Sequence, residues 1–340
     1  MKLTAARVRA LLAGALCCAL PYAALPAAIL PPELLQTGAR GVVEDHYPVR
    51  QVVFAGGVNS LADVVYSQPG GFRPLTLDLY LPPAGKAGAR PDRPLVVFIH
   101  GGGWASGHAR HSGAFQNWPG ILAAIAARGY VVASLNHRLS SEAKFPAAIQ
   151  DVKVAIRWLR SRSAEYGIDK AHVLVWGGSS GGELAALAAT SCNEPALAPP
   201  ANAPAESDCV QAALLWYPIV DLAGLPGPQG AAPSSQGRYL GCEVPDCPPE
   251  TVRLASPGLQ VTARTPPMLI IHGSDDTTAP VQQSINLDAA LKKAGVRSEL
   301  IVLPGIGHQF VGKSLEATHE ASVLAITRSI EFIESVFPVP

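Results

Sequence analysis

The chain has 340 residues with 26 basic and 26 acidic side chains, and 48% of its residues are hydrophobic while only 15% are charged. This composition predicts a sizeable buried core and excludes an intrinsically disordered chain. A net charge of zero offers no basic surface, so no nucleic-acid partner is expected. The length alone fits one large α/β domain or two small ones.

The first 27 residues resemble a secretory signal peptide. Three basic residues precede an apolar run at 10–20, and small residues and prolines follow, without a clean A-x-A triplet to mark cleavage. The run is shorter than the ~20 apolar residues of a membrane span, so we expect no stable span and a secreted or periplasmic protein. Removal of residues 1–27 would leave 23 bases against 26 acids, a net charge of −3. Lipid anchoring at Cys17 and an uncleaved apolar terminus are the alternatives.

Four cysteines remain beyond this leader. An exported protein with four cysteines is expected to hold two disulfides. Pairing nearest neighbours in sequence predicts Cys192 with Cys209 and Cys242 with Cys247, and unpaired buried thiols are the alternative. Neither a C-x-x-C pair nor a Cys/His zinc spacing occurs, so no metal is expected.

Strands and helices are predicted to alternate along the rest of the chain. Short apolar runs bounded by Gly and Pro indicate buried strands, and apolar residues at helical spacing indicate helices between them. This alternation predicts an α/β fold with a mostly parallel sheet covered on both faces. The expected strands are 75–81, 95–99, 131–135, 172–176, 212–216, 268–271 and 299–303, and the expected helices are 115–127, 147–165, 182–190, 281–294 and 315–336.

Two segments interrupt the alternation. The first insertion (191–208) is rich in Ala, Pro and Asn, and the second insertion (223–267) is rich in Gly, Pro and Ser. Long loops in a compact domain are commonly functional lids. Ligands of parallel sheets bind beyond the carboxyl ends of the strands, so we expect both insertions to form a small, loop-rich lid there.

A glycine-rich turn, Gly177-Gly-Ser-Ser-Gly-Gly182, connects a predicted strand to a predicted helix. A serine in G-x-S-x-G at such a turn is a nucleophile elbow, in which a strained backbone exposes the hydroxyl at a helix N-terminus. The pattern fits both Ser179 and Ser180. The rival interpretation, a phosphate loop, lacks its G-K-[ST] lysine.

The strand at 95–99 ends in His100-Gly-Gly-Gly-Trp104, here called the glycine loop. Consecutive glycines allow backbone N–H groups to converge on one point, as an oxyanion hole requires. A flexible loop without function is the alternative.

A carboxylate and a histidine follow the last two predicted strands. They are Asp275 or Asp276, and then His308. The order Ser, Asp, His is that of the α/β-hydrolases. His108 and His111 are spaced for one metal, but no third ligand stands near them in sequence, and we expect them at the surface or a pocket rim.

Together these motifs resemble α/β-hydrolase-fold serine esterases, in particular bacterial carboxylesterases similar to hormone-sensitive lipase and to small feruloyl and acetyl esterases. The resemblance extends over about 73–337. Its motifs are Leu75-Thr-Leu-Asp-Leu-Tyr-Leu-Pro82, the glycine loop, His137-Arg-Leu139, Phe145-Pro146, Asp151, the Ser179 turn, Tyr217-Pro218, Asp221, Ser256-Pro257, His272-Gly273, Asp276 and Gly307-His308.

The resemblance implies roles for these residues. The elbow of this family reads G-x-S-A-G-G, which implies Ser179 as the nucleophile, and its acid stands four residues after the histidine of a His-Gly pair, which implies Asp276. The oxyanion donors implied are the N–H groups of Gly102, Gly103 and Ser180. No cofactor is implied.

Two positions depart from the family pattern. His137 replaces a common tyrosine, and Glu183 replaces the His or Asn that often follows the double glycine. Trp104 and Trp118 are expected to line the substrate pocket, with core packing as the alternative for each.

The expected function is hydrolysis of small or medium carboxylic esters, of short-acyl, acetyl or aryl and feruloyl type, by one hydrolase domain at 28–340. Three other functions use the same residues or fold. They are an amidase, formamidase or peptidase, a non-catalytic binding protein, and an acyltransferase.

Overall fold

The computed structural model describes residues 50–83, 92–228 and 232–339. These residues belong to one compact unit. The predicted signal peptide, Cys17 and the predicted domain start at residue 28 lie outside the described residues.

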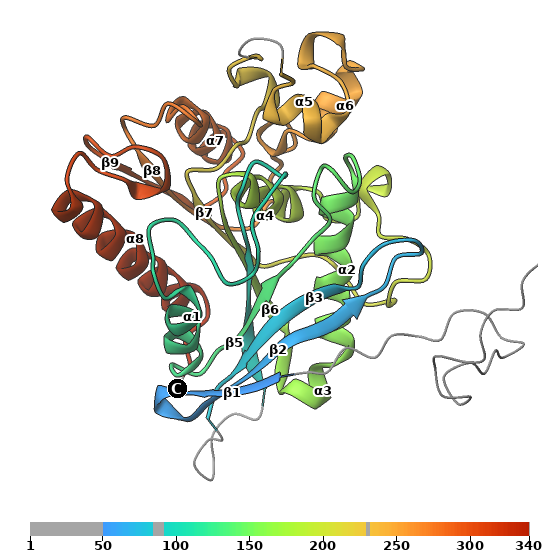
Figure 1. The fold of residues 1–340 in the computed structure, drawn as a ribbon, viewed down its shortest axis with the longest axis vertical. Helices are drawn as coiled ribbons and strands as arrows, with labels where there is room; N and C mark the ends of the chain where they lie inside the picture. The colour runs from blue at the N-terminus through green and yellow to red at the C-terminus, as the bar shows by residue number, and fades with distance from the viewer. Residues whose placement is uncertain (1–49, 84–91, 229–231, 340) are drawn as a thin grey trace, which may run out of the picture. The chain divides into compact units, whose positions relative to one another are not determined.

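A nine-stranded sheet forms the centre of the fold (Figure 1). Its strand order is β1-β2-β3-β5-β4-β6-β7-β8-β9, and the strands from β5 to β9 are parallel, whereas β1, β2 and β3 are antiparallel to their neighbours. All seven predicted strands are present. The strands are β1 (Arg50–Phe54), β2 (Val58–Ser67), β3 (Leu75–Leu81), β4 (Arg93–Ile99), β5 (Val131–Leu135), β6 (Ile168–Gly178), β7 (Ala212–Trp216), β8 (Met268–Gly273) and β9 (Ser298–Leu303).

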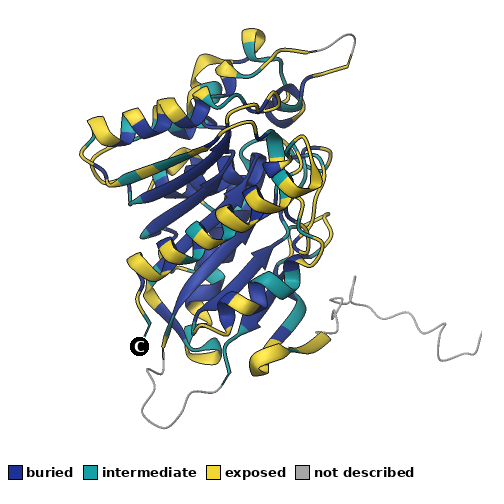
Figure 2. Cartoon of the chain, turned by 90° about the vertical axis from the view of Figure 1, so that its left-hand side faces the viewer, coloured by how far each residue is buried: buried dark blue, intermediate teal, exposed yellow. Residues whose placement is uncertain are grey.

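Helices cover both faces of this sheet. Buried residues of α2, α4 and α7 pack on one face, and those of α1 and α8 pack on the other. Figure 2 shows the buried sheet between helices whose outer faces are exposed. The expected α/β architecture, a mostly parallel sheet covered on both faces, is therefore confirmed. The helices are α1 (Trp118–Ala126), α2 (Ala147–Ser161), α3 (Ser163–Tyr166), α4 (Ser180–Thr190), α5 (Ser235–Leu240), α6 (Pro249–Leu254), α7 (Gln282–Lys293) and α8 (Leu315–Val336).

The second insertion carries short helices, α5 and α6, where the sequence predicted loops. Ser234 begins α5 by accepting a hydrogen bond from the N–H of Gly237, and Gly241 ends it in a left-handed conformation with φ 85°. Each helix has six residues, too few to produce a recognisable helical period. Both lie beyond one end of the sheet (Figure 1).

One disulfide closes the first insertion and another lies within the second insertion. They join Cys192 to Cys209 and Cys242 to Cys247, which confirms the pairing of nearest neighbours. Between 50 and 339, apart from the undescribed gaps, no helix is long and apolar enough to cross a bilayer.

Trp118 lies in the core and not in the pocket where it was expected. Its side chain is fully buried, and its ring packs 4.6 Å from that of Phe98 and 5.1 Å from that of Trp176, measured between centroids. Because Trp118 stands at the start of α1, its side chain is directed toward the sheet. Trp118 is therefore a core residue, which was the alternative in the sequence analysis.

Replacement of Trp118 by alanine is expected to lower the free energy of unfolding by about 3–5 kcal/mol, because large-to-small changes of buried aromatics leave a cavity. Urea denaturation followed by circular dichroism measures this change. Trp118→Phe is the matched control and is expected to cost less, since most of the ring volume remains. An unfolding free energy unchanged in the alanine variant would contradict the assignment to the core.

Candidate active site

Ser179 stands at a sharp turn between β6 and α4. Its backbone has φ 57° and ψ −126°, a conformation that residues other than glycine rarely adopt. Ser180 is the first residue of α4, so its N–H belongs to the helix N-terminus, where negative charge is favoured. The turn therefore has the strained geometry of a nucleophile elbow.

Glycine contacts distinguish the two registers that the pattern left open. A Cβ on Gly177 would overlap the carbonyl oxygen of Gly181, and a Cβ on Gly181 would overlap a carbonyl oxygen of β4. On Gly178 or Gly182 the same atom would lie at 3.0 Å or more from its neighbours. The pair of glycines that the turn requires most strictly is the pair that flanks Ser179.

The structure brings His308 and Asp276 to this serine. His308 Nε2 lies 3.0 Å from Ser179 Oγ, and His308 Nδ1 lies 2.6 Å from Asp276 Oδ2. Asp276 follows β8 and His308 follows β9, so the carboxyl ends of neighbouring parallel strands assemble the three groups. This is the geometry in which an imidazole can remove the serine proton while a carboxylate orients it.

The Asp276 carboxylate is held in its charged form. Burial opposes this charge, but hydrogen bonds from His272 and His308 and from the N–H of Ala279 outweigh burial, so the pKa of Asp276 lies well below its usual value. The backbone N–H groups of Thr278 and Ala279 each donate at 2.8 Å. A carboxylate fixed in this way stays ionised while the neighbouring imidazole gains a proton.

Asp275, the other candidate acid, points elsewhere. Its carboxylate accepts a hydrogen bond from Ser274 Oγ at 2.7 Å and lies 4.0 Å from the Lys313 ammonium, at the surface. The geometry thus separates the two aspartates that the sequence pattern placed side by side.

Two neighbours of this site had no role predicted from the sequence. His272 is fully buried, and its Nε2 faces the Ala279 carbonyl at 2.8 Å and Asp276 Oδ2 at 3.2 Å. Because both partners are acceptors, Nε2 carries the hydrogen. Tyr217 packs against the ring of His308, with centroids 4.8 Å apart. In the sequence, the His272-Gly273 and Tyr217-Pro218 motifs at strand ends were the features that could have pointed to these two residues.

The glycine loop lies beside Ser179. Gly102 has φ 122° and Gly103 has φ 60°, and a Cβ on Gly102 would overlap the carbonyl oxygen of Ser106. Both glycines line the cavity that contains Ser179. Within the described residues, neither of their N–H groups has a hydrogen-bond acceptor, so both are available to an oxyanion.

A cavity of about 640 Å³ opens over these groups. Ser179, His308 and Trp104 line it together with residues of the second insertion. Trp104 therefore borders the cavity as expected, although its side chain is almost fully buried. The lining from the second insertion comes from 225–227 and 232–236 with Arg238.

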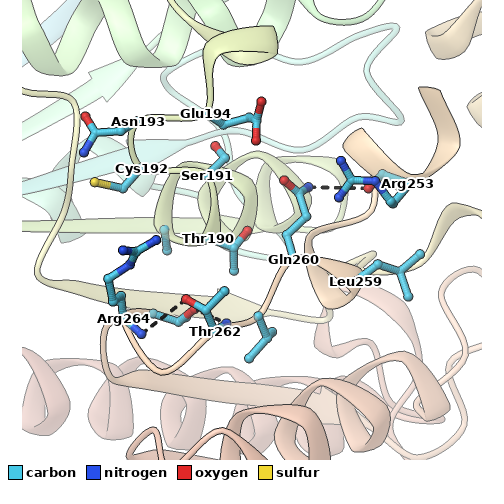
Figure 3. Close-up of a pocket in the computed structure, with 13 residues that line it drawn as sticks. Thr190, Ser191, Cys192, Asn193, Glu194, Arg253, Leu259, Gln260, Thr262 and Arg264 are labelled. Carbon is cyan, nitrogen blue, oxygen red and sulfur yellow. Dashed lines mark hydrogen bonds between the residues drawn. The ribbon is translucent and has the colours of Figure 1, made fainter. Parts of the chain in front are cut away.

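Another cavity, of about 570 Å³, lies beside the Cys192–Cys209 disulfide and contains none of Ser179, Asp276 and His308 (Figure 3). Residues at the end of α4 and in 259–265 surround it. His108 and His111 line a third and smaller cavity, with ring centroids 6.2 Å apart. No cluster of three or more metal-ligating side chains occurs among the residues described.

The first residue of the glycine loop, His100, stacks on a second histidine, His137. The rings of His100 and His137 lie 4.4 Å apart at an interplanar angle of 14°. Burial lowers the pKa of both, and the proximity of His137 lowers the pKa of His100 further. The folded protein therefore keeps this pair neutral at pH values where the unfolded chain binds protons.

Acid is accordingly expected to destabilise the fold through this pair. Below about pH 6.5 the unfolded chain takes up protons that the folded state does not, so the unfolding free energy falls as pH decreases, by up to about 2.7 kcal/mol per pH unit for two histidines. Urea titrations between pH 8 and 5 measure the slope. His137→Gln should reduce it, whereas His319→Gln, at an exposed site of α8, should not. Equal slopes for His137→Gln and the unsubstituted protein would refute this origin.

The known proteins to which this chain is similar include several esterases. Esterase LipC of Mycobacterium tuberculosis is 35% identical over 64% of this chain and 53% of LipC, so the chain spans about half the length of this curated relative. A solved structure described as "Truncated form of carbohydrate esterase from gut microbiota" is 29% identical with a TM-score of 0.64, covering 80% of this chain and 96% of the other. Esterase Est2 of Thermogutta terrifontis, in its butyrate-bound form, is 30% identical with a TM-score of 0.63, covering 80% and 92%.

The family model described as BD-FAE matches residues 77–291, which include the glycine loop, Ser179 and Asp276. This match covers more than half of the 340 residues. The chain belongs to the BD-FAE family of the α/β-hydrolase fold.

Proposed function

We propose that the protein is a serine carboxylic-ester hydrolase that acts through an acyl-enzyme on small or medium esters. The observation that carries this proposal is the continuous hydrogen-bonded series from Ser179 Oγ through His308 to Asp276 at the floor of an open cavity. The esterases named above are similar to this chain and support the same reaction class.

In the first half of the reaction, His308 Nε2 removes the proton of Ser179 as its oxygen attacks the ester carbonyl. The N–H groups of Gly102, Gly103 and Ser180 bind the resulting oxyanion, and Asp276 stabilises the imidazolium. Collapse of this tetrahedral intermediate breaks the bond to the alcohol, which takes the proton from His308.

In the second half, water attacks the acyl-enzyme. His308 accepts the proton of this water, the oxyanion again forms beside the glycine loop, and the acid leaves as Ser179 regains its proton. Every step uses residues of this chain and one water molecule.

The cavity supports a substrate of limited size. Its volume of about 640 Å³ lies within the ~300–1,000 Å³ typical of small-molecule sites. Apolar Ile219 and Leu225 and polar Ser235, Gln236 and Arg238 all border it. Short acyl groups joined to an aromatic or sugar alcohol match this mixed lining.

A panel of p-nitrophenyl esters tests the proposal, with acetate, butyrate, octanoate and laurate compared by kcat/KM. We expect turnover with a preference for acetate or butyrate. Parallel assays of p-nitroanilides and N-formyl aromatic amines identify an amidase or formamidase, and added alcohol acceptors identify an acyltransferase. Turnover of amides but not of esters would overturn the assignment. Absence of turnover on every substrate would favour a binding protein.

We also propose that the mature protein is secreted or periplasmic. Two disulfides support an oxidising compartment. Mass spectrometry of the exported protein, alkylated before and after reduction, is expected to find four protected cysteines and a chain shortened by about 27 residues, as the sequence pattern predicts. Retention of the full-length chain in the cytoplasm would contradict it.

A further inference from the structure

Glu183 is a fully buried carboxyl group that the proposed reaction does not use. It lies in the first turn of α4, the helix that begins directly after Ser179. Burial raises the pKa of this carboxyl to about 8, although the polar groups of Trp104 and Tyr239 beside it oppose the increase. The group is therefore mostly protonated at neutral pH.

The indole of Trp104 binds this carboxyl directly. Trp104 Nε1 donates a hydrogen bond to Glu183 Oε2 at 3.0 Å, in a fully buried environment. The ring of Tyr239 stacks on the indole, with centroids 4.5 Å apart and an interplanar angle of 5°. The three side chains thus form one buried cluster, here called the Glu183 cluster.

The second carboxyl oxygen has spare hydrogen-bonding capacity. The Tyr239 hydroxyl interacts electrostatically with the Glu183 carboxyl, but the two groups do not form a hydrogen bond. Glu183 Oε1 and the Tyr239 hydroxyl are both buried without a hydrogen-bond partner among the residues described. A proton on Oε1 can therefore face the hydroxyl, whereas a carboxylate charge would be buried without a cation beside it.

Each member of the Glu183 cluster belongs to a different part of the site. Glu183 is in the helix that starts at the nucleophile, Trp104 ends the glycine loop, and Tyr239 is in α5 of the second insertion. Trp104 itself has φ 57° and directly follows Gly103, so the direction of the indole is coupled to the backbone that carries the oxyanion donors. Its carbonyl accepts a hydrogen bond from the N–H of Ser140 at 2.7 Å.

We propose that Glu183 is a positioning residue that fixes the glycine loop and α5 relative to the nucleophile by holding Trp104 and Tyr239. The proposal rests on the proposed esterase function. It assigns a role to the position where the chain departs from its family pattern.

The position of the oxyanion donors is sensitive to this contact. Displacement of a catalytic group by about 1 Å can cost about 100-fold in rate. The oxyanion forms only as the reaction proceeds, so misplaced donors lower kcat more than they change KM. Loss of the Glu183 contact should therefore appear in kcat.

Ionisation of Glu183 should also lower kcat, but by less than removal of its side chain. The titratable group that acts on Glu183 is Tyr239, whose own pKa is raised well above its usual value by burial and by the Glu183 charge, so Glu183 loses its proton first. Trp104 is the other group facing it and does not titrate. The unsubstituted enzyme should consequently lose activity at alkaline pH with a midpoint near 8.

The test compares kcat and KM for p-nitrophenyl butyrate from pH 6 to 10 in the unsubstituted protein, Glu183→Gln and Glu183→Ala. The glutamine variant keeps an acceptor for the indole but cannot ionise, so it should retain kcat within about threefold at pH 7 and lack the alkaline decrease. The alanine variant should lose about 10- to 100-fold in kcat with little change in KM. Trp104→Phe, which removes the indole donor together with part of the ring, should also lower kcat and serves if Glu183→Ala does not fold.

Two results would overturn the role. One is an alkaline decrease in Glu183→Gln identical to that of the unsubstituted protein, and the other is unchanged kcat in a folded Glu183→Ala or Trp104→Phe. If the unsubstituted protein hydrolyses no ester, the proposed function fails instead, so the two failures are distinguishable.

Discussion

Replacement of Ser179 by alanine is expected to lower kcat for p-nitrophenyl butyrate by about 10⁴- to 10⁶-fold, the range found when a triad nucleophile is removed. The oxygen that forms the acyl-enzyme is lost, while the glycine loop and the substrate cavity remain. Residual turnover would come from oxyanion binding alone. KM should change little, because the hydroxyl contributes mainly to the reaction and not to substrate binding.

Ser180→Ala is the matched control for this experiment. The role proposed for Ser180 uses only its backbone N–H, which alanine retains, so less than about a tenfold loss is expected. Near-normal activity of Ser179→Ala, combined with inactive Ser180→Ala, would move the nucleophile to the other register of the turn.

Asp276→Asn is expected to reduce kcat by about 10⁴-fold, as for other buried triad carboxylates. The amide has nearly the shape of the carboxylate but cannot stabilise the His308 imidazolium, and its NH₂ group favours the wrong imidazole tautomer. The unsubstituted Asp276 has a pKa well below its usual value, so the carboxylate is charged across the working pH range. Steady-state kinetics at pH 7 and 8 measure the loss.

Asp275→Asn supplies the comparison, because the two residues are adjacent and chemically identical. Its side chain is directed to Ser274 and the surface, away from His308, so a loss below about threefold is expected for a surface carboxylate. Equal losses in the two variants would contradict the assignment of Asp276.

Much of the fold could be predicted because strands buried on both faces produce continuous apolar runs. The parallel strands β4 to β8 are buried over most of their length, and all were expected. The edge strand β1 (Arg50–Phe54) is largely exposed and contains only three consecutive apolar residues, too few to indicate a buried strand. The helices α5 and α6 were missed because six residues cannot establish a helical period.

The motif pattern by itself predicted the residue types of the candidate site but not their register. Ser179 and Ser180 both satisfied the elbow pattern, and Asp275 and Asp276 both followed β8. The resemblance to the esterase family implied Ser179 and Asp276. The three-dimensional contacts favour the same choice, through the overlap that a side chain at Gly177 would create and the approach of Asp276 to His308.

The sequence also could not distinguish an aromatic residue of the pocket from one of the core. Trp104 and Trp118 were both expected to line the pocket, but the start of α1 directs Trp118 into the core. The Glu183 cluster could not be expected from spacing either, since its members are far apart in the sequence. The role proposed for Glu183 follows from its burial, which the sequence alone does not show.

Reaction with a fluorophosphonate, followed by mass spectrometry of the digested protein, tests most directly whether Ser179 is an activated nucleophile. We expect one covalent adduct per chain, located on Ser179, at a rate that falls sharply in Asp276→Asn and with no adduct in Ser179→Ala. An adduct on Ser180, or no adduct on a folded protein, would contradict the central claim.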